Sequence, residues 1–253
     1  MPTLPSQVDV ISRRELIRGF DYGPGQHVTT LGPTQRGKTT LALQLLGHVT
    51  NKDHKAVLLA GKPPHRDAVM GKAADRMNLT IVEEWPPTPV EKFKTRNKNG
   101  YVLRPHQTLS DLDADNENLR KQFRKALMTN YASKEPVITV VDEAHHVQND
   151  LGLKKEYEAP LMRGAPHNAV WSIIQRGRFM TYLVYDAPEH LFIFYDPDRS
   201  NQKRYSEIGG VDPGQLIYLT ENLKTARGPN GNTISECVYI RRSGPEIYIV
   251  GMT

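Results

Sequence analysis

Cysteine is almost absent from this sequence. Cys237 is the single cysteine among 253 residues. An intrachain disulfide and a metal site built from cysteines are therefore both excluded. A chain without disulfides is typical of a reducing compartment, so the sequence predicts a cytoplasmic location, in a bacterium or in a host cell.

Long apolar runs are missing as well. No segment approaches the roughly 18 consecutive apolar residues that a membrane-spanning helix needs, and residues 1–15 alternate polar and apolar side chains instead of forming the apolar centre of a signal peptide. We therefore expect no intrinsic membrane segment. Internal repeats and low-complexity tracts are also absent, and the length suits one large α/β domain, with or without modest insertions.

The charge balance is mildly basic. The formal net charge is +5 and the isoelectric point is about 9.2. Such a balance is compatible with a nucleic-acid partner, but many solvated enzymes are equally basic, so charge alone does not decide between these classes.

Residues 27–48 contain the most informative motif. Residues 32–39 fit the pattern G-x-x-x-x-G-K-[ST] of the phosphate-binding P-loop, or Walker A motif. A short apolar run precedes it and an apolar, helix-patterned stretch follows, which is the required context; the alternative is a chance match in a glycine-containing turn. The residues expected to bind the nucleotide are Gly32, Pro33, Thr34, Gln35, Arg36, Gly37, Lys38, Thr39 and Thr40.

Two side chains of this motif have specific expected roles. Lys38 would reach the β- and γ-phosphate oxygens, and the hydroxyl of Thr39 would ligate magnesium. The sequence therefore predicts that the chain binds ATP together with Mg²⁺.

A second motif ends an apolar run. Residues 136–141 read as a buried strand, and Asp142 and Glu143 follow it directly, as in a Walker B motif. Asp142 would hold the magnesium and Glu143 would orient and polarise the attacking water. The alternative is an ordinary buried strand that happens to end in acidic residues.

The apolar run 168–174 also reads as a buried strand, and the polar residue Gln175 follows it directly. Open α/β sheets bind ligands at the carboxyl ends of their strands, so Gln175 is a candidate sensor of the γ-phosphate; the alternative is a surface amide. Arg176 and Arg178 follow at once.

Further elements are predicted from periodicity and turn residues. Strands are expected at 56–60, 80–85, 190–195 and 214–219, and a hairpin at 237–240 and 246–250. Helices are expected at 12–18, 67–77, 115–131 and 199–208. The turn at 61–64 is expected near the nucleotide. Residues 90–106 interleave basic and aromatic side chains, which fits either a loop that tracks a nucleic-acid backbone or a solvated hairpin.

The order of these motifs resembles that of the HerA/FtsK superfamily of P-loop DNA-pumping ATPases. The resemblance runs from about Gly25 to the C-terminus and includes residues 194–196, 208–209 and 214–218. It implies an α/β fold of the RecA-like P-loop NTPase type, with a mostly parallel central sheet flanked by helices and a C-terminal β-hairpin. The expected organisation is a lead-in over 1–26 and one ATPase motor domain over 27–253, with a basic loop and helix inserted at 90–131.

The resemblance also implies roles and partners. Gln175 matches the family's polar sensor, and Arg163, twelve residues earlier, is placed where an arginine acts on the ATP of the neighbouring subunit. Four other arginines are candidates for the same role: Arg176, Arg178, Arg199 and Arg204. The alternative for Arg163 is that it is a surface residue without such a role. The implied activity is ATP hydrolysis coupled to translocation of double-stranded DNA, in viral genome packaging or mobile-element transfer. The implied partners are double-stranded DNA and a homo-oligomeric ring, expected to be a hexamer, with a portal or membrane protein and association with a virion as further candidates.

The sequence departs from the pattern of this family at two points, and three alternative functions remain open. The chain lacks room for the winged-helix module and membrane anchor of chromosome translocases, so we expect a bare motor domain. Residues 142–145 spell the DEAH motif, but too few residues follow Gln175 to build a second helicase domain, and we interpret His145 as incidental. The alternative functions are a phage assembly or secretion ATPase acting on protein, a P-loop kinase and a nucleotide-dependent switch. The Asp142–Glu143 pair favours hydrolysis over the last two.

Overall fold

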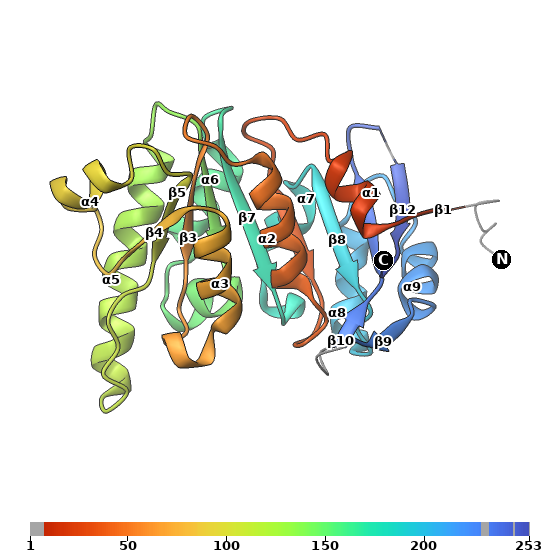
Figure 1. The fold of residues 1–253 in the computed structure, drawn as a ribbon. Coiled ribbons are helices and arrows are strands. Elements are labelled where there is room, and N and C mark those ends of the chain that lie inside the picture. Colours follow the sequence, from red (N-terminus) through yellow and green to blue (C-terminus); the bar gives the residue numbers. More distant parts are fainter. Residues whose placement is uncertain (1–7, 229–232, 245, 253) are drawn as a thin grey trace.

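The computed structural model describes residues 8–228, 233–244 and 246–252. Within these residues ten strands form one sheet in the order β1-β12-β11-β8-β2-β7-β6-β3-β5-β4 (Figure 1). Its strands are β1 Asp9–Ile11, β2 Val28–Leu31, β3 Lys55–Leu59, β4 Leu79–Val82, β5 Gly100–Leu103, β6 Val137–Val141, β7 Asn168–Ile174, β8 His190–Phe194, β11 Cys237–Arg241 and β12 Glu246–Val250. A separate two-stranded ribbon pairs β9 Thr225–Arg227 with β10 Thr233–Ser235.

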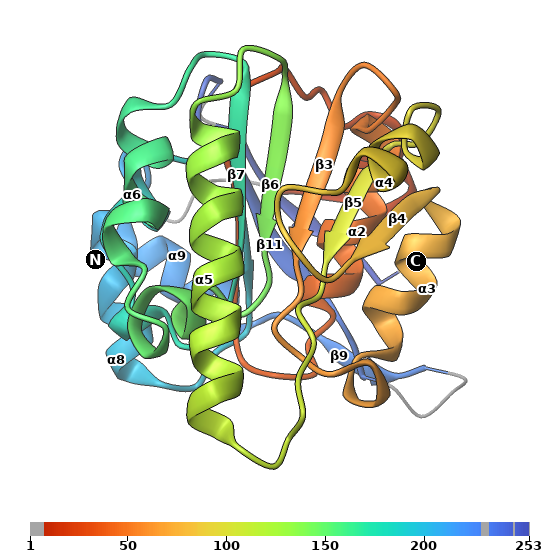
Figure 2. The same cartoon turned by 90° about the vertical axis from the view of Figure 1, so that its left-hand side faces the viewer.

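Helices cover both faces of the sheet. They are α1 Arg13–Arg18, α2 Lys38–Val49, α3 Ala68–Arg76, α4 Pro89–Lys94, α5 Leu112–Tyr131, α6 Lys154–Arg163, α7 Leu183–Asp186, α8 Arg199–Gln202 and α9 Pro213–Glu221. Figure 2 shows α5 and α6 on one side of the sheet and α2 and α3 on the other. None of the helices in the described part of the chain has the length and apolar character to cross a bilayer.

The central strands are apolar along their whole length because both of their faces are covered. All five residues of β6 and all seven of β7 are buried. One core cluster packs Phe123 of α5 and Tyr157 of α6 against the sheet, and the other packs Leu41 and Leu45 of α2 against the opposite face. The carboxyl ends of β2, β7 and β6 therefore lie side by side at one edge of this packed sheet.

The predicted fold class is confirmed. Strands β2 to β8 pair in parallel, and β11 and β12 form the expected antiparallel C-terminal hairpin. Residues 9–18 of the expected lead-in contribute β1, which pairs with β12, and α1, which begins with a capping box of Ser12 and Glu15.

Two predictions of local structure are wrong. Residues 214–219 form part of helix α9, not a strand: Asp212 caps the helix, Pro213 opens it, and Leu216, Leu219 and Thr220 are buried at helical spacing. Residues 90–106 form no hairpin, because α4 and a turn lead into β5, which lies between β3 and β4 and pairs in parallel with both. The short apolar run of β5 is masked in the sequence by the charged residues around it.

Candidate functional site

The loop between β2 and α2 has the backbone that phosphate binding requires. Gly37, the N-cap of α2, has a φ of +91° and no side chain caps the helix, so the first N–H groups of α2 are left for a ligand. Gly32 has a φ of +140°, and a Cβ there would lie 2.8 Å from the Cβ of Phe194. Both glycines are therefore required by the shape of the loop.

The side chain of Lys38 is buried beneath this loop. Its Nζ donates a hydrogen bond of 2.6 Å to the carbonyl oxygen of Pro33. Burial lowers the pKa of Lys38 to about 8, although the carboxylate of Asp142 opposes the shift. A desolvated ammonium next to uncapped N–H groups is well suited to hold phosphate oxygens.

The predicted magnesium ligands meet across two strands. Thr39 Oγ1, in the first turn of α2, donates to Asp142 Oδ1 over 3.4 Å, and Asp142 is buried directly after β6. Burial raises the pKa of Asp142, while the nearby ammonium of Lys62 opposes the rise. A hydroxyl and one carboxylate fit Mg²⁺, which is held by one or two protein oxygens and completed by water and phosphate. No cluster of three or more His, Cys, Asp or Glu suited to a metal occurs among the described residues.

Glu143 is held by two partners. Its backbone has a φ of +52°, which is unusual for a residue other than glycine and is found at functional sites. Gln175 Nε2 donates to Glu143 Oε1 over 3.0 Å, and Lys62 Nζ lies 2.9 Å from the same oxygen. The structure thus brings the expected water-orienting acid and the expected sensor into direct contact.

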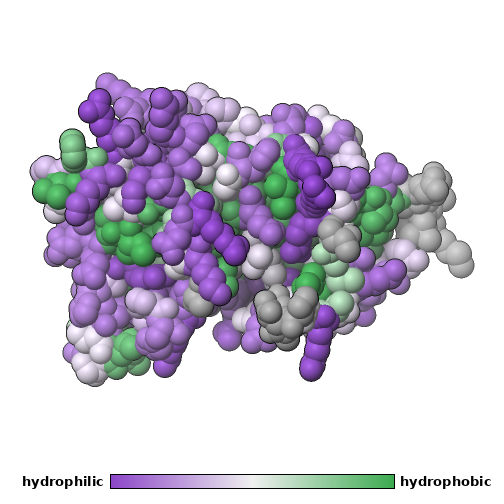
Figure 3. Space-filling view, in the orientation of Figure 1, coloured by the Kyte–Doolittle hydropathy of each residue, from purple (hydrophilic) through white to green (hydrophobic). Residues whose placement is uncertain are grey.

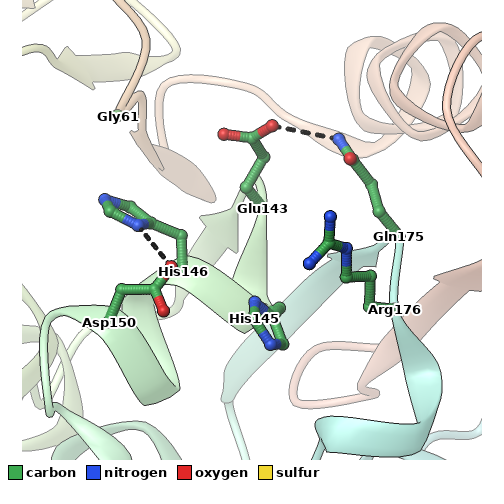
Figure 4. Close-up of a pocket in the computed structure, with 7 residues that line it drawn as sticks. All are labelled: Gly61, Glu143, His145, His146, Asp150, Gln175 and Arg176. Atoms are coloured by element: carbon green, nitrogen blue, oxygen red, sulfur yellow. Dashed lines mark hydrogen bonds and ion pairs between the residues drawn. The ribbon is translucent and has the colours of Figure 1, made fainter.

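A cavity of about 330 Å³ opens beside these side chains. It is lined by Gly61, Glu143, His145, His146, Asp150, Gln175 and Arg176. In Figure 4 the carboxylate of Glu143 and the amide of Gln175 point toward one another, with Arg176 beneath them and the His146–Asp150 pair across the cavity. The carboxylate of Glu143 therefore borders a polar cavity that is large enough to hold water. His145, which we interpreted as incidental, also lines it.

Arg163 lies far from the site of its own chain. It ends α6 just before β7, whereas Gln175 comes directly after β7. The seven residues of β7 span about 23 Å. Arg163 is exposed, so it is available to another copy of the chain but not to its own Glu143.

The rival arginines differ in their surroundings. Arg178, Arg199 and Arg204 form ion pairs with Asp198, Glu221 and Glu207, at 3.5, 2.6 and 2.9 Å. Arg176 instead lines the cavity beside Gln175. Of the five arginines considered from the sequence, Arg176 is therefore the one at the site itself.

Sequence reasoning assigned no role to two charged residues near the site. Lys62 was covered only by the expectation that the turn 61–64 lies near the nucleotide. Asp196, which the resemblance included only as part of 194–196, lies just after β8 and raises the pKa of Lys38 against the effect of burial. Only the strand order could have pointed to them. Lys62 follows β3, which neighbours β6, and Asp196 follows β8, which neighbours β2.

No protein-family model matches this chain, and no curated protein matches it in sequence. Solved structures do match its fold. The DNA-packaging ATPase B204 from Sulfolobus Turreted Icosahedral Virus has a TM-score of 0.54 and 12% identity, with 92% of this chain and 100% of that chain covered. The genome packaging NTPase B204 from Sulfolobus turreted icosahedral virus 2 in complex with AMPPCP has a TM-score of 0.54 and 12% identity, covering 91% and 100% of the two chains. The expected resemblance to P-loop ATPases is thereby confirmed at the level of the fold.

Proposed function

We propose that this chain is an ATPase that uses hydrolysis to move double-stranded DNA, working as a ring of identical subunits. The observation that carries the hydrolytic part is the contact between Gln175 and Glu143 beside the Thr39–Asp142 pair. A kinase has no need of a carboxylate arranged to polarise water, so this arrangement favours hydrolysis.

The side chains divide the chemistry among themselves. Lys38 and the N–H groups of the loop bind the β- and γ-phosphates. Thr39 and Asp142 would hold Mg²⁺, which neutralises charge on the phosphate oxygens when bound. Glu143 orients the attacking water and accepts its proton, and Gln175, in contact with Glu143, responds to the loss of the γ-phosphate.

The solved structures with similar folds support DNA as the molecule that this chain moves. The two solved structures described above are named as DNA-packaging or genome-packaging enzymes, and one holds the ATP analogue AMPPCP. The match covers almost all of this chain and the whole of each of theirs.

The position of Arg163 supports a ring. An arginine that is exposed and lies at the opposite end of β7 from Glu143 serves hydrolysis only in trans. In a ring it would reach the ATP of the next subunit and stabilise charge in the transition state, an effect of about 10³–10⁵ in rate for such arginines.

A basic surface on α4 and the following turn is a candidate for DNA contact. It consists of Lys92, Lys94, Arg96 and Lys98, and Phe93 among them is 76% exposed. Glu91 is engaged in the cap of α4 by Thr88. Arg104, expected in the same stretch, is instead buried against Asp67.

Figure 3 shows that the face with α2 and α3 is mostly hydrophilic, with its hydrophobic residues in separate patches.

The deciding experiment is steady-state ATP hydrolysis with and without linear double-stranded DNA, at increasing salt, with Glu143→Gln as the control. We expect stimulation by duplex that weakens with salt, because contacts to the DNA backbone release counterions, and no turnover in the variant. Hydrolysis that needs Glu143 but ignores DNA would contradict the DNA load and favour an assembly ATPase acting on protein.

A further inference from the structure

Lys62 lies between the two acidic residues of the Walker B motif. Its Nζ is 2.9 Å from Glu143 Oε1 and 3.8 Å from Asp142 Oδ2. The Lys62 side chain is 34% exposed, whereas that of Asp142 is only 5% exposed. One ammonium group therefore contacts both carboxylates and offsets part of their negative charge.

The ammonium shares a carboxylate with the expected magnesium site. Thr39 Oγ1 approaches Asp142 Oδ1, while Lys62 Nζ approaches Oδ2 of the same side chain. A divalent cation on Asp142 and the ammonium of Lys62 would be like charges on one carboxylate in a largely buried position, where screening by water is weak. Binding of a divalent cation at Asp142 would therefore weaken the attraction that holds Lys62 there.

The loop that carries Lys62 is anchored on both sides of it. Gly61, just before Lys62, accepts a hydrogen bond of 2.9 Å from Gln107 Nε2. Asp67, after it, caps α3 and pairs with Arg104 over 2.9 Å in a buried salt bridge. With its flanks fixed, Lys62 can change partners by rotation of its long side chain while the backbone stays in place.

Lys62 also occupies the oxygen that hydrolysis needs. Lys62 and Gln175 both contact Oε1 of Glu143. An oxygen that already accepts from an ammonium and an amide has less room to accept a hydrogen bond from water. Departure of Lys62 would leave Oε1 of Glu143 in contact with Gln175 alone and open to water.

We propose that Lys62 is a positioning residue that competes with the divalent cation for Asp142 and Glu143, and that it leaves both carboxylates when Mg²⁺ and nucleotide bind together. The inference rests on the proposed function, since it assumes an ATP site at this loop. It assigns to Lys62 the role of keeping Glu143 paired until the complete substrate is present.

The test measures binding without turnover and without DNA. The dissociation constant of AMPPCP is measured by calorimetry in excess EDTA and in excess Mg²⁺, and the ratio of the two values gives the contribution of Mg²⁺. In Lys62→Met we expect this ratio to rise at least about tenfold over the unchanged protein, because Mg²⁺ no longer displaces an ammonium. Lys62→Arg, which keeps the charge, should return the ratio close to its original value.

Two further variants sharpen the result. Lys155→Met, an exposed lysine on α6, is the matched control and should leave the ratio unchanged. In the Glu143→Gln background, Lys62→Met should have a smaller effect, because one of the two carboxylates that attract Lys62 is already neutral.

Other outcomes would overturn the inference. Weaker AMPPCP binding in both conditions, with an unchanged ratio, would make Lys62 a ligand of the phosphates. An unchanged ratio with unchanged affinity would make it a surface lysine. The proposal that the chain moves DNA is tested separately, and hydrolysis that does not respond to DNA would contradict it. A complete lack of AMPPCP binding by the unchanged protein would contradict the ATP site itself.

Discussion

Gln175 donates a hydrogen bond of 3.0 Å to Glu143, across the ends of two neighbouring parallel strands. The two residues are 32 positions apart in the sequence. Glu143 follows β6 and Gln175 follows β7, so the register of this strand pair brings the two side chains together. In the proposed function this contact links the acid that would orient water to the amide that would sense the γ-phosphate.

Removal of this hydrogen bond should slow hydrolysis more than it weakens substrate binding. For Gln175→Leu we expect kcat to fall about 10- to 100-fold with little change in KM, because Glu143 then loses one of the two groups that hold its carboxylate. Steady-state kinetics measure both constants, with Gln44→Leu, at an exposed position of α2, as the control. A kcat within about twofold of the unchanged protein would make Gln175 a surface amide.

Arg163 should be essential only in trans. We expect Arg163→Ala to lower turnover by about 10³ or more while leaving AMPPCP affinity unchanged, because its own site does not contain it. Mixing Arg163→Ala subunits with Lys38→Ala subunits should restore partial activity, since some interfaces then combine an intact site with an intact arginine. Failure to complement, together with a larger loss in Arg176→Ala, would transfer the role to Arg176.

The basic surface of α4 should contribute to DNA affinity in a way that depends on salt. For Lys92→Glu combined with Lys94→Glu we expect weaker binding of linear duplex and a shallower dependence of log K on log salt, by about one unit for each DNA phosphate that the variant no longer neutralises. Fluorescence anisotropy over a salt series gives the slope. Lys154→Glu with Lys155→Glu, two exposed lysines on α6, is the matched control, and equal losses of affinity in both pairs would show only a change in net charge.

The salt bridge between Arg104 and Asp67 should be important for stability. Both side chains are nearly inaccessible, 8% and 6% exposed. Arg104→Met leaves Asp67 buried without its partner, so we expect the free energy of unfolding to fall by about 3–5 kcal/mol. Adding Asp67→Asn should recover much of the loss. Urea denaturation measures both, and Arg120→Met, which breaks an exposed pair with Glu117, should cost less than about 1 kcal/mol.

Acid should destabilise the chain through His190. This histidine is fully buried between the hydroxyl of Tyr239 and the amide oxygen of Gln26, and burial lowers its pKa to about 4. Between about pH 6.5 and pH 4 the unfolded chain binds a proton at this residue that the folded chain does not, so the stability falls as the pH drops, by up to about 3 kcal/mol. Urea denaturation at pH 7 and pH 5 should show a smaller pH dependence in His190→Gln. An identical dependence would assign the acid sensitivity to other groups.

Local sequence was sufficient to predict those parts of the fold whose backbone geometry admits only certain residue types. The P-loop prediction needed only the glycines, Lys38 and Thr39, because a tight phosphate-binding turn restricts which residues fit at each place. The buried strands β6, β7 and β8 were predicted for a similar reason: covered strands need continuous apolar runs. Helix α9 was misread because its apolar residues also fit a short buried strand, and the capping signal of Asp212 and Pro213 was overlooked.

The sequence by itself thus predicted the glycine-rich loop between β2 and α2 and the acidic residues after β6, since both follow from residue types at short spacing, and it predicted the class of fold through its resemblance to P-loop ATPases. Only the tertiary structure decided which distant side chains meet. It joined Glu143 to Gln175 and Lys62, buried Arg104 against Asp67, and separated Arg163 from its own site by the length of β7. These relationships depend on the order and register of strands in the sheet, which hydrogen bonds between distant segments establish and which no short stretch of sequence contains.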